Sequence, residues 1–274
     1  MTGPRHATVR SQSGQSGLPG ALFPLAAVGV LFLVLPVLGL LVRTPWRTLA
    51  DELTSSDSLT ALRLSLECAS LATLLCALLG VPLAWLLARG RFRGRGVLRA
   101  LVIVPLVLPP VVGGVALFTA FGRRGIVGSH VYDAFGVALP FTTWAVVVAE
   151  AFVAMPFLVI AVEGALRGAD ARLDEAAATL GASRWYTFRR VTLPLVAPGL
   201  AAGAVLCWAR ALGEFGATIT FAGNFPGTTR TMPVEVYLAL QQDPSAAIAL
   251  SLLLLVVSVA VLAGLRERWL TIPV

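Results

Sequence analysis

Six long apolar stretches run along the chain, and each has the length that a bilayer requires of a helix. They cover approximately residues 21–42, 62–88, 97–121, 138–162, 195–220 and 245–265. A helix rises about 1.5 Å per residue and the hydrocarbon core is about 30 Å thick, so about 20 apolar residues span it. The apolar positions are continuous and do not alternate, which favours helices over a membrane β-barrel. The pattern predicts an all-α integral membrane protein with about six transmembrane helices in residues 21–265.

The composition excludes several classes of soluble protein. Hydrophobic residues make up 57% of the 274 residues and charged residues only 13%, compared with about 25% charged residues in an average globular domain. So few charges cannot cover the surface of a soluble fold of this size. All 21 basic residues are arginine. Without lysine the chain has neither a Schiff-base residue nor a phosphate-binding loop of the usual lysine-containing form, so it has no ATP site of that kind.

The arginines predict which side of the membrane each loop occupies. If the N-terminus is cytoplasmic, fourteen arginines lie in cytoplasmic segments and five in outer loops. This bias predicts that both termini are cytoplasmic, with residues 1–20 as a disordered tail and 266–274 as a short C-terminal tail. The net charge of +7 then reflects topology and does not indicate nucleic-acid binding. The arginine-rich loop from Arg89 to Arg99 is expected to contact anionic headgroups. The first apolar run is longer than a signal-peptide core and is interpreted as an anchor.

The cytoplasmic segment at residues 163–194 is the longest loop, and its sequence predicts two short helices. Asp170 can cap the first helix, Gly181 can end it in a left-handed conformation, and Ser183 can cap the second. Proline is expected to end the second helix at Leu193-Pro194. Exposed apolar side chains on such a hairpin suit a protein interface. From the residues alone, an ordinary amphipathic surface hairpin is the alternative.

The spacing of this segment resembles the EAA motif of permease subunits of binding-protein-dependent ABC importers. The resemblance covers roughly residues 62–265 and implies the fold of a type I ABC importer permease, in which this loop is the coupling helix that binds the ATP-hydrolysing subunit. The positions that carry it, with their neighbours on the second helix, are Glu175, Ala176, Ala177, Gly181, Arg184, Trp185, Phe188 and Pro194. The resemblance therefore predicts that these residues form the ATPase-coupling surface.

Finer features are similar to the molybdate branch of these permeases. They are the proline-rich run at residues 104–113, the Gly-Arg-Arg-Gly segment from residue 122, the run at 209–221, and the Pro-Gly-Thr-Thr-Arg-Thr segment at 226–231. Sulfate permeases share the core from Arg210 to Gly216, so a sulfate or thiosulfate permease is the alternative. The resemblance implies molybdate, or the related tungstate, as the transported oxyanion.

Charged residues and helix breakers inside the membrane mark candidates for the translocation path or its gate. Charges are costly in lipid and should be paired or face a polar interior. Arg210 and Glu214 are four residues apart, and the pair either neutralises itself for packing or belongs to the gate. Glu150 is expected to be buried, either protonated or paired with a partner such as Arg210. The path candidates are Pro109, Pro110, Gly113, Arg210, Gly213, Glu214, Gly216 and Thr218.

Other features of the membrane segments are interpreted as structural. Arg63 and Glu67 are read as a plain ion pair, and the three cysteines are read as small packing residues. The spacing Gly199-x-x-x-Gly203 is typical of close helix packing. Neither a metal-ligand pattern nor a catalytic constellation is present in the sequence, so no cofactor is expected.

The resemblance also implies how the protein assembles in a bacterial cell membrane. It implies a homodimer, two copies of a separate ABC ATPase, and an extracytoplasmic binding protein that meets the loops at residues 43–57, 122–137 and 222–244. Transport would follow alternating access between two states that bind the partners differently. A secondary anion carrier is the competing class, and the absence of an inverted repeat weighs against it.

Overall fold

The computed structural model describes residues 22–270, and all regular structure in that range is helical. The elements are α1 (Leu22–Arg43), α2 (Leu49–Thr54), α3 (Ser56–Arg89), α4 (Arg95–Val107), α5 (Pro110–Phe121), α6 (Gly128–Phe135), α7 (Thr143–Gly168), α8 (Ala171–Thr179), α9 (Arg184–Thr187), the π-helix η1 (Phe188–Thr192), α10 (Leu193–Leu212), α11 (Gly216–Phe221), α12 (Met232–Gln242) and α13 (Pro244–Leu270). The all-α prediction is confirmed. The predicted tail at 1–20 lies outside the described residues, and α13 continues beyond the predicted boundary at residue 265.

The first helix forms a compact unit separate from the rest of the chain, which begins as a second unit at Thr44. Helix α1 is 22 residues long, contains Pro36, and buries none of its residues. A helix that is apolar on every side can be solvated by lipid without protein contacts. The predicted first membrane segment is therefore present as one continuous helix.

Five helical stretches are long and apolar enough to cross a membrane, namely α1, α3, α7, the continuous run Arg184–Leu212, and α13. The third predicted segment is not a single straight helix, because α4 and α5 meet at an angle of 119°. Pro109 lacks an N–H and excludes helical geometry at Leu108, which has extended dihedrals (φ −66°, ψ 131°). Pro110 is the first residue of α5. The N–H at this position has no partner within a helix, so its absence in proline breaks no hydrogen bond. Counted as one bent span, this pair brings the total to six.

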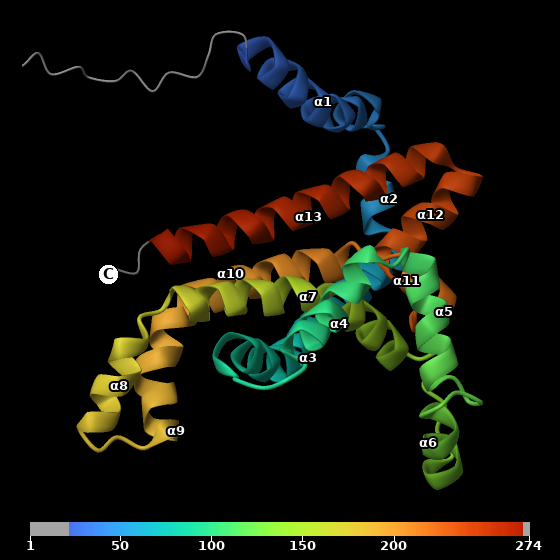
Figure 1. Ribbon diagram of the computed structural model, residues 1–274. Coiled ribbons are helices and arrows are strands. Elements are labelled where there is room, and N and C mark those ends of the chain that lie inside the picture. The colour runs from blue at the N-terminus through green and yellow to red at the C-terminus, as the bar shows by residue number, and fades with distance from the viewer. Residues whose placement is uncertain (1–21, 271–274) are drawn as a thin grey trace, which may run out of the picture. The chain divides into compact units, whose positions relative to one another are not determined.

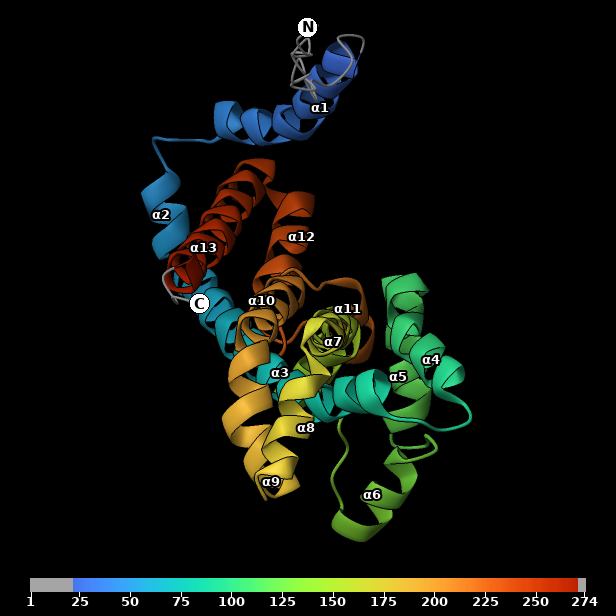
Figure 2. The same cartoon turned by 60° about the vertical axis from the view of Figure 1, so that its left-hand side comes forward.

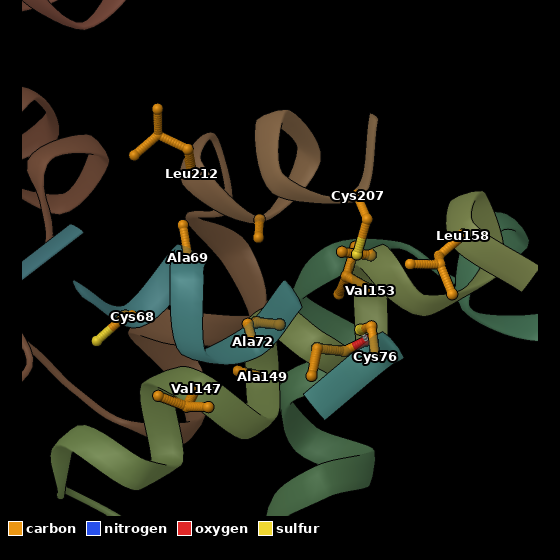
Figure 3. Packing of buried hydrophobic residues seen from close by; sticks show 14 of the residues in the cluster. Cys68, Ala69, Ala72, Cys76, Val147, Ala149, Val153, Leu158, Cys207 and Leu212 are labelled. Carbon is orange, nitrogen blue, oxygen red and sulfur yellow. Dashed lines mark hydrogen bonds between the residues drawn. The ribbon is translucent and has the colours of Figure 1, made fainter. Parts of the chain in front are cut away.

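The core of the second unit lies where α3, α7 and α10 pack together (Figures 1 and 2). Small buried side chains let these helices approach closely, including Ala69 and Ala72 of α3, Ala149 of α7 and Cys207 of α10 (Figure 3). The three cysteines are free and buried, and the Cys76 Sγ contacts the Ala151 carbonyl oxygen at 3.4 Å. Dense packing of small residues replaces the hydrophobic driving force that helices lack in lipid.

A smaller cluster joins α2, α3, α12 and α13 around Ala61, Met232 and Leu250. The backbone N–H of Met232 donates to the Ser65 Oγ at 2.6 Å, which ties the start of α12 to α3. The loops that were expected to meet a binding protein contain short helices: α2 in the first, α6 in the second and α12 in the third. These loops are therefore ordered surfaces within the second unit.

Gly203 is a point of close approach between α10 and α7. A β-carbon at Gly203 would lie 2.9 Å from the Ala161 Cβ and 3.3 Å from the Leu158 carbonyl oxygen. We expect Gly203→Ala to destabilise the protein by about 1–3 kcal/mol, the usual cost of overpacking. Thermal unfolding in detergent measures the effect. Gly164→Ala is the matched control, because Gly164 in α7 has open space around it. Equal melting temperatures for the two variants would contradict tight packing at Gly203.

Candidate coupling surface and membrane interior

The loop between α7 and α10 folds into the predicted helical hairpin, and its caps are those that the sequence indicates. The Asp170 carboxylate accepts a hydrogen bond from the Arg172 N–H at 2.9 Å at the start of α8. Gly181 has φ +81°, the left-handed conformation expected after a helix end. The Ser183 hydroxyl accepts from the Tyr186 N–H at 3.3 Å and caps α9. Figure 1 shows α8 and α9 side by side, projecting from the ends of α7 and α10.

The prediction that Leu193-Pro194 ends the second helix is wrong. The helical run is continuous from Arg184 to Leu212, with the π-helix η1 between α9 and α10. The Leu193 N–H donates to the Phe188 carbonyl, five residues back instead of four. This wider turn comes immediately before Pro194. It accommodates the proline, which has no backbone N–H to donate a helical hydrogen bond. The hairpin is thus joined directly to the membrane helix α10 through a π-turn.

The predicted coupling residues occupy two different environments on the hairpin. The exposed ones are Glu175, Ala176, Gly181, Arg184, Trp185 and Pro194, whereas Ala177 and Phe188 are half-buried. Phe188 packs between two tryptophans, with ring centroids 5.2 Å from Trp85 and 5.6 Å from Trp185. It therefore anchors the hairpin to α3 and is not a free contact for a partner.

The tip of the hairpin presents large apolar side chains to solvent. Leu180 is 88% exposed and Trp185 is 69% exposed. A hollow of about 490 Å³ lies at the bend, lined by Ala177, Leu180, Tyr186 and their neighbours. Sequence analysis did not single out Leu180, although an apolar residue directly before a left-handed glycine was the available signal. Exposed apolar anchors beside a hollow are the features of a protein interface.

Three arginines at or near the hairpin end of the bundle pair with acidic side chains of α7 and α8. Arg89 Nη2 lies 3.5 Å from Asp174 Oδ2. Glu163 is buried and pairs with both Arg99 and Arg167, with Arg167 Nη2 at 2.8 Å from Glu163 Oε1. Arg89 and Arg99, at the two ends of the arginine-rich loop, are therefore engaged by carboxylates, and headgroup contact of the loop between them stays a prediction. The Arg89–Asp174 and Arg99–Glu163 pairs each join residues at least 60 positions apart, so local sequence patterns did not reveal them.

The predicted Arg210–Glu214 pair is present, but it lies at the end of a helix and not within one. Arg210 Nη2 is 2.7 Å from Glu214 Oε2. Helix α10 ends at Leu212, and Glu214 stands in the break before α11. Its other oxygen, Oε1, accepts from the Ala217 N–H at 2.8 Å. Glu214 is thus both a counter-ion and the acceptor of an N–H in the first turn of α11, and the sequence did not indicate the second role.

The remaining path candidates gather where α5 meets α11. A β-carbon at Gly216 would lie 2.6 Å from the Pro110 Cβ, so the start of α5 rests against the start of α11. Gly113 faces Phe152 of α7, with space for a methyl group at ordinary contact distance. Thr218 is fully buried, and its hydroxyl lacks a hydrogen-bond partner among the described residues. Pro109 and Gly213 lie at the two breaks that bring α5 and α11 into this contact.

Glu150 lies in the buried part of α7 and forms no ion pair within residues 22–270. Its side chain is 1% exposed, and its Oε2 lacks a hydrogen-bond partner in that range. Arg210, the partner considered from sequence, is engaged by Glu214. An unpaired carboxylate is costly in such surroundings, and residues 22–270 offer Glu150 no counter-ion.

The second predicted pair, Arg63 and Glu67, is present on the surface of α3. Arg63 Nε lies 2.7 Å from Glu67 Oε1, and the two side chains are 81% and 51% exposed. This geometry agrees with the plain structural reading. Among the described residues, no group of three or more His, Cys, Asp and Glu side chains is placed to hold a metal ion.

Comparison with known proteins agrees with the fold. An ABC transporter for the polysaccharide alginate has a TM-score of 0.73 at 19% identity, covering 93% of this chain and 95% of that chain. The MetNI methionine ABC transporter has a TM-score of 0.62 at 19% identity, covering 81% of this chain and 100% of that chain. At such low identity these structures show a shared permease fold, that of type I ABC importers.

Sequence comparison shows the family. The molybdenum transport system permease protein ModB of Mycobacterium tuberculosis is 49% identical over 92% of this chain and 95% of its own length. ModB of Escherichia coli K12 is 44% identical over 77% of this chain and 92% of its own length. Residues 80–272 match the family described as the inner membrane component of binding-protein-dependent transport systems. With its five or six spans, the chain is a multi-pass inner membrane protein and belongs to this family of transport permeases.

Proposed function

We propose that this chain is the membrane-spanning subunit of an ABC importer that takes up molybdate. The observation that carries the proposal is the 49% identity over 92% of the chain with a molybdenum transport permease. The exposed hairpin supports it, because Leu180 and Trp185 offer apolar anchors for a cytoplasmic partner. ATP hydrolysis is assigned to that partner, because the chain has no lysine and no phosphate-binding loop.

The proposed cycle follows from the connection between the hairpin and the membrane helices. Two copies of the chain form the path on their shared axis, and each binds one ATPase subunit through α8 and α9. Closure of the ATPase dimer moves the two hairpins together. Since α9 continues through η1 into α10, this movement reaches the membrane core directly. Both termini are then cytoplasmic, and the loops containing α2, α6 and α12 face the binding protein. Alternating access follows from the different affinities of the two states for the partners.

We expect ATP-driven uptake of molybdate when the permease is reconstituted into liposomes with its ATPase and its loaded binding protein. Uptake of radiolabelled molybdate is measured with and without ATP, and excess sulfate or tungstate is added as competitor. Sulfate should leave molybdate uptake nearly unchanged if, as proposed, the loaded binding protein delivers only molybdate to the path. Uptake without ATP would indicate a secondary carrier. Strong inhibition by sulfate, with ATP-driven sulfate uptake, would indicate the sulfate permease instead.

A further inference from the structure

Asp174 connects the coupling hairpin to two other parts of the molecule through its two carboxylate oxygens. It lies in the first turn of α8 and is half-buried. Its Oδ1 accepts a hydrogen bond from the Thr192 hydroxyl at 2.8 Å, at the end of the π-helix that leads into α10. Its Oδ2 lies 3.5 Å from Arg89 Nη2, at the last residue of α3. One side chain therefore links α8 to both α10 and α3.

Arg89 extends this connection to a third membrane helix. The same Nη2 that faces Asp174 also lies 3.5 Å from the carbonyl oxygen of Ala169, the residue that caps the C-terminus of α7. Thr192 is fully buried, and Arg89 and Asp174 are each about one quarter exposed. A partly buried link of this kind is screened less by water than a surface pair. The cytoplasmic ends of α3, α7 and α10, the three helices of the core, are thus connected through Arg89 and Asp174.

The apolar packing between the hairpin and α3 is incomplete at this point. A hollow of about 710 Å³ separates them, with Val81, Pro82 and Trp85 on the α3 side and Ala178 on the α8 side. Helix α8 packs mainly against α9 and η1, which belong to its own hairpin. Contact across the hollow comes from Phe188 on Trp85 and from Asp174 on Arg89. Because a hollow can be compressed, the hairpin can tilt there unless a directional contact prevents it.

We infer that Asp174 is a positioning residue that, with Arg89 and Thr192, holds the coupling hairpin at a fixed angle to the membrane core. The inference rests on the proposed function, in which the ATPase moves this hairpin. With the link intact, displacement of α8 moves the ends of α3, α7 and α10 together. Without the link, the hairpin still presents Leu180 and Trp185 to the ATPase. When the ATPase moves the hairpin, however, the hairpin tilts into the hollow and does not displace the membrane helices. The ATPase then hydrolyses ATP without a matching change in the membrane helices.

The test compares Asp174→Asn with the wild type in the complete reconstituted complex with loaded binding protein. Molybdate uptake and ATP hydrolysis are measured on the same liposomes, and their ratio is the readout. We expect the ratio to fall by about tenfold, the scale on which one charge-assisted hydrogen bond shifts an equilibrium, while the ATPase still co-purifies. Arg89→Gln should give the same result. Asp174→Glu keeps the carboxylate and should recover part of the ratio.

Glu67→Gln is the matched control. It also removes a carboxylate that pairs with an arginine, but this pair lies on the exposed surface of α3. It should leave the ratio unchanged. If Asp174→Asn lowers the amount of folded permease, Thr192→Val removes a single hydrogen bond and is measured in the same way. An unchanged ratio in these variants overturns the inference, and so does loss of the ATPase on purification, which would place Asp174 in the docking surface. If the wild-type complex shows no ATP-driven uptake, the proposed function fails, and the inference fails with it.

Discussion

Glu214→Ala is expected to destabilise the permease by about 3–5 kcal/mol, the cost of removing one partner from a buried ion pair. Glu214 is 1% exposed and Arg210 is 29% exposed on its side chain, with 2.7 Å between Arg210 Nη2 and Glu214 Oε2. The alanine variant leaves the guanidinium without its counter-ion in an apolar bundle. It also removes the acceptor of the Ala217 N–H, which leaves a buried donor in the first turn of α11 unsatisfied at a typical cost of about 1–3 kcal/mol.

Two further variants distinguish the loss of the ion pair with Arg210 from the loss of the hydrogen bond to the Ala217 N–H. Glu214→Gln keeps an oxygen that can accept from Ala217 and removes only the negative charge, so it should be less damaging than alanine. Glu67→Gln breaks the other pair with four-residue spacing, whose side chains are mostly exposed, and should cost at most about 1 kcal/mol. Thermal unfolding of purified permease in detergent ranks the three variants. Equal melting temperatures for Glu214→Ala and Glu67→Gln would contradict a buried, stabilising pair.

The Glu214→Gln variant also distinguishes the two roles that the sequence leaves open for Arg210 and Glu214, helix packing and gating of the path. If the pair serves only packing, Glu214→Gln permease that remains folded should transport at a rate that follows its folded fraction. If the pair belongs to the gate, uptake should fall further than the folded fraction, because a bare guanidinium would retain an oxyanion in the path. Uptake per folded molecule in liposomes is therefore the measurement that distinguishes the roles.

Features that depend on neighbours in sequence were predictable. The caps at Asp170 and Ser183, the left-handed Gly181 and the close approach at Gly203 each follow from residues a few positions apart. The hydrophobic pattern located the membrane segments because lipid demands about 20 apolar residues wherever a helix crosses it. In these cases local chemistry determines local structure, and one sequence contains the necessary information.

Features that depend on distant or irregular contacts were not predictable. Pro109 and Pro110 indicated a break, but neither the 119° angle between α4 and α5 nor the packing of α5 on α11 could be read from them. Pro194 was read as a helix end, whereas a π-turn absorbs it and the helix continues. The contact of Arg89 with Asp174 joins residues that are far apart in the sequence. Hydropathy and capping rules describe residues close together in the sequence, so they do not predict the tertiary contacts that bring such distant groups together.

Gly181→Val is expected to abolish coupling to the ATPase without unfolding the membrane core. Gly181 has φ +81°, and a β-branched residue is strained in that conformation by about 1–2 kcal/mol or more. Nothing lies within 4 Å of a β-carbon at this position, so the effect comes from the backbone and not from a steric clash. The turn between α8 and α9 must then change, and Leu180 and Trp185 leave their relative positions at the tip. We expect weak co-purification of the ATPase and loss of molybdate uptake.

Gly181→Asn is the matched control for this experiment, because asparagine adopts the left-handed conformation more readily than other non-glycine residues. Asparagine, like valine, adds a side chain at this exposed site. The Gly181→Asn variant should nevertheless retain most of the ATPase co-purification and most of the molybdate uptake. Gly168→Val tests a valine at another open position, near the end of α7. If valine and asparagine at residue 181 behave alike, the backbone conformation of the turn is not what the ATPase requires. If only valine fails, with an unchanged melting temperature, the turn itself shapes the coupling surface.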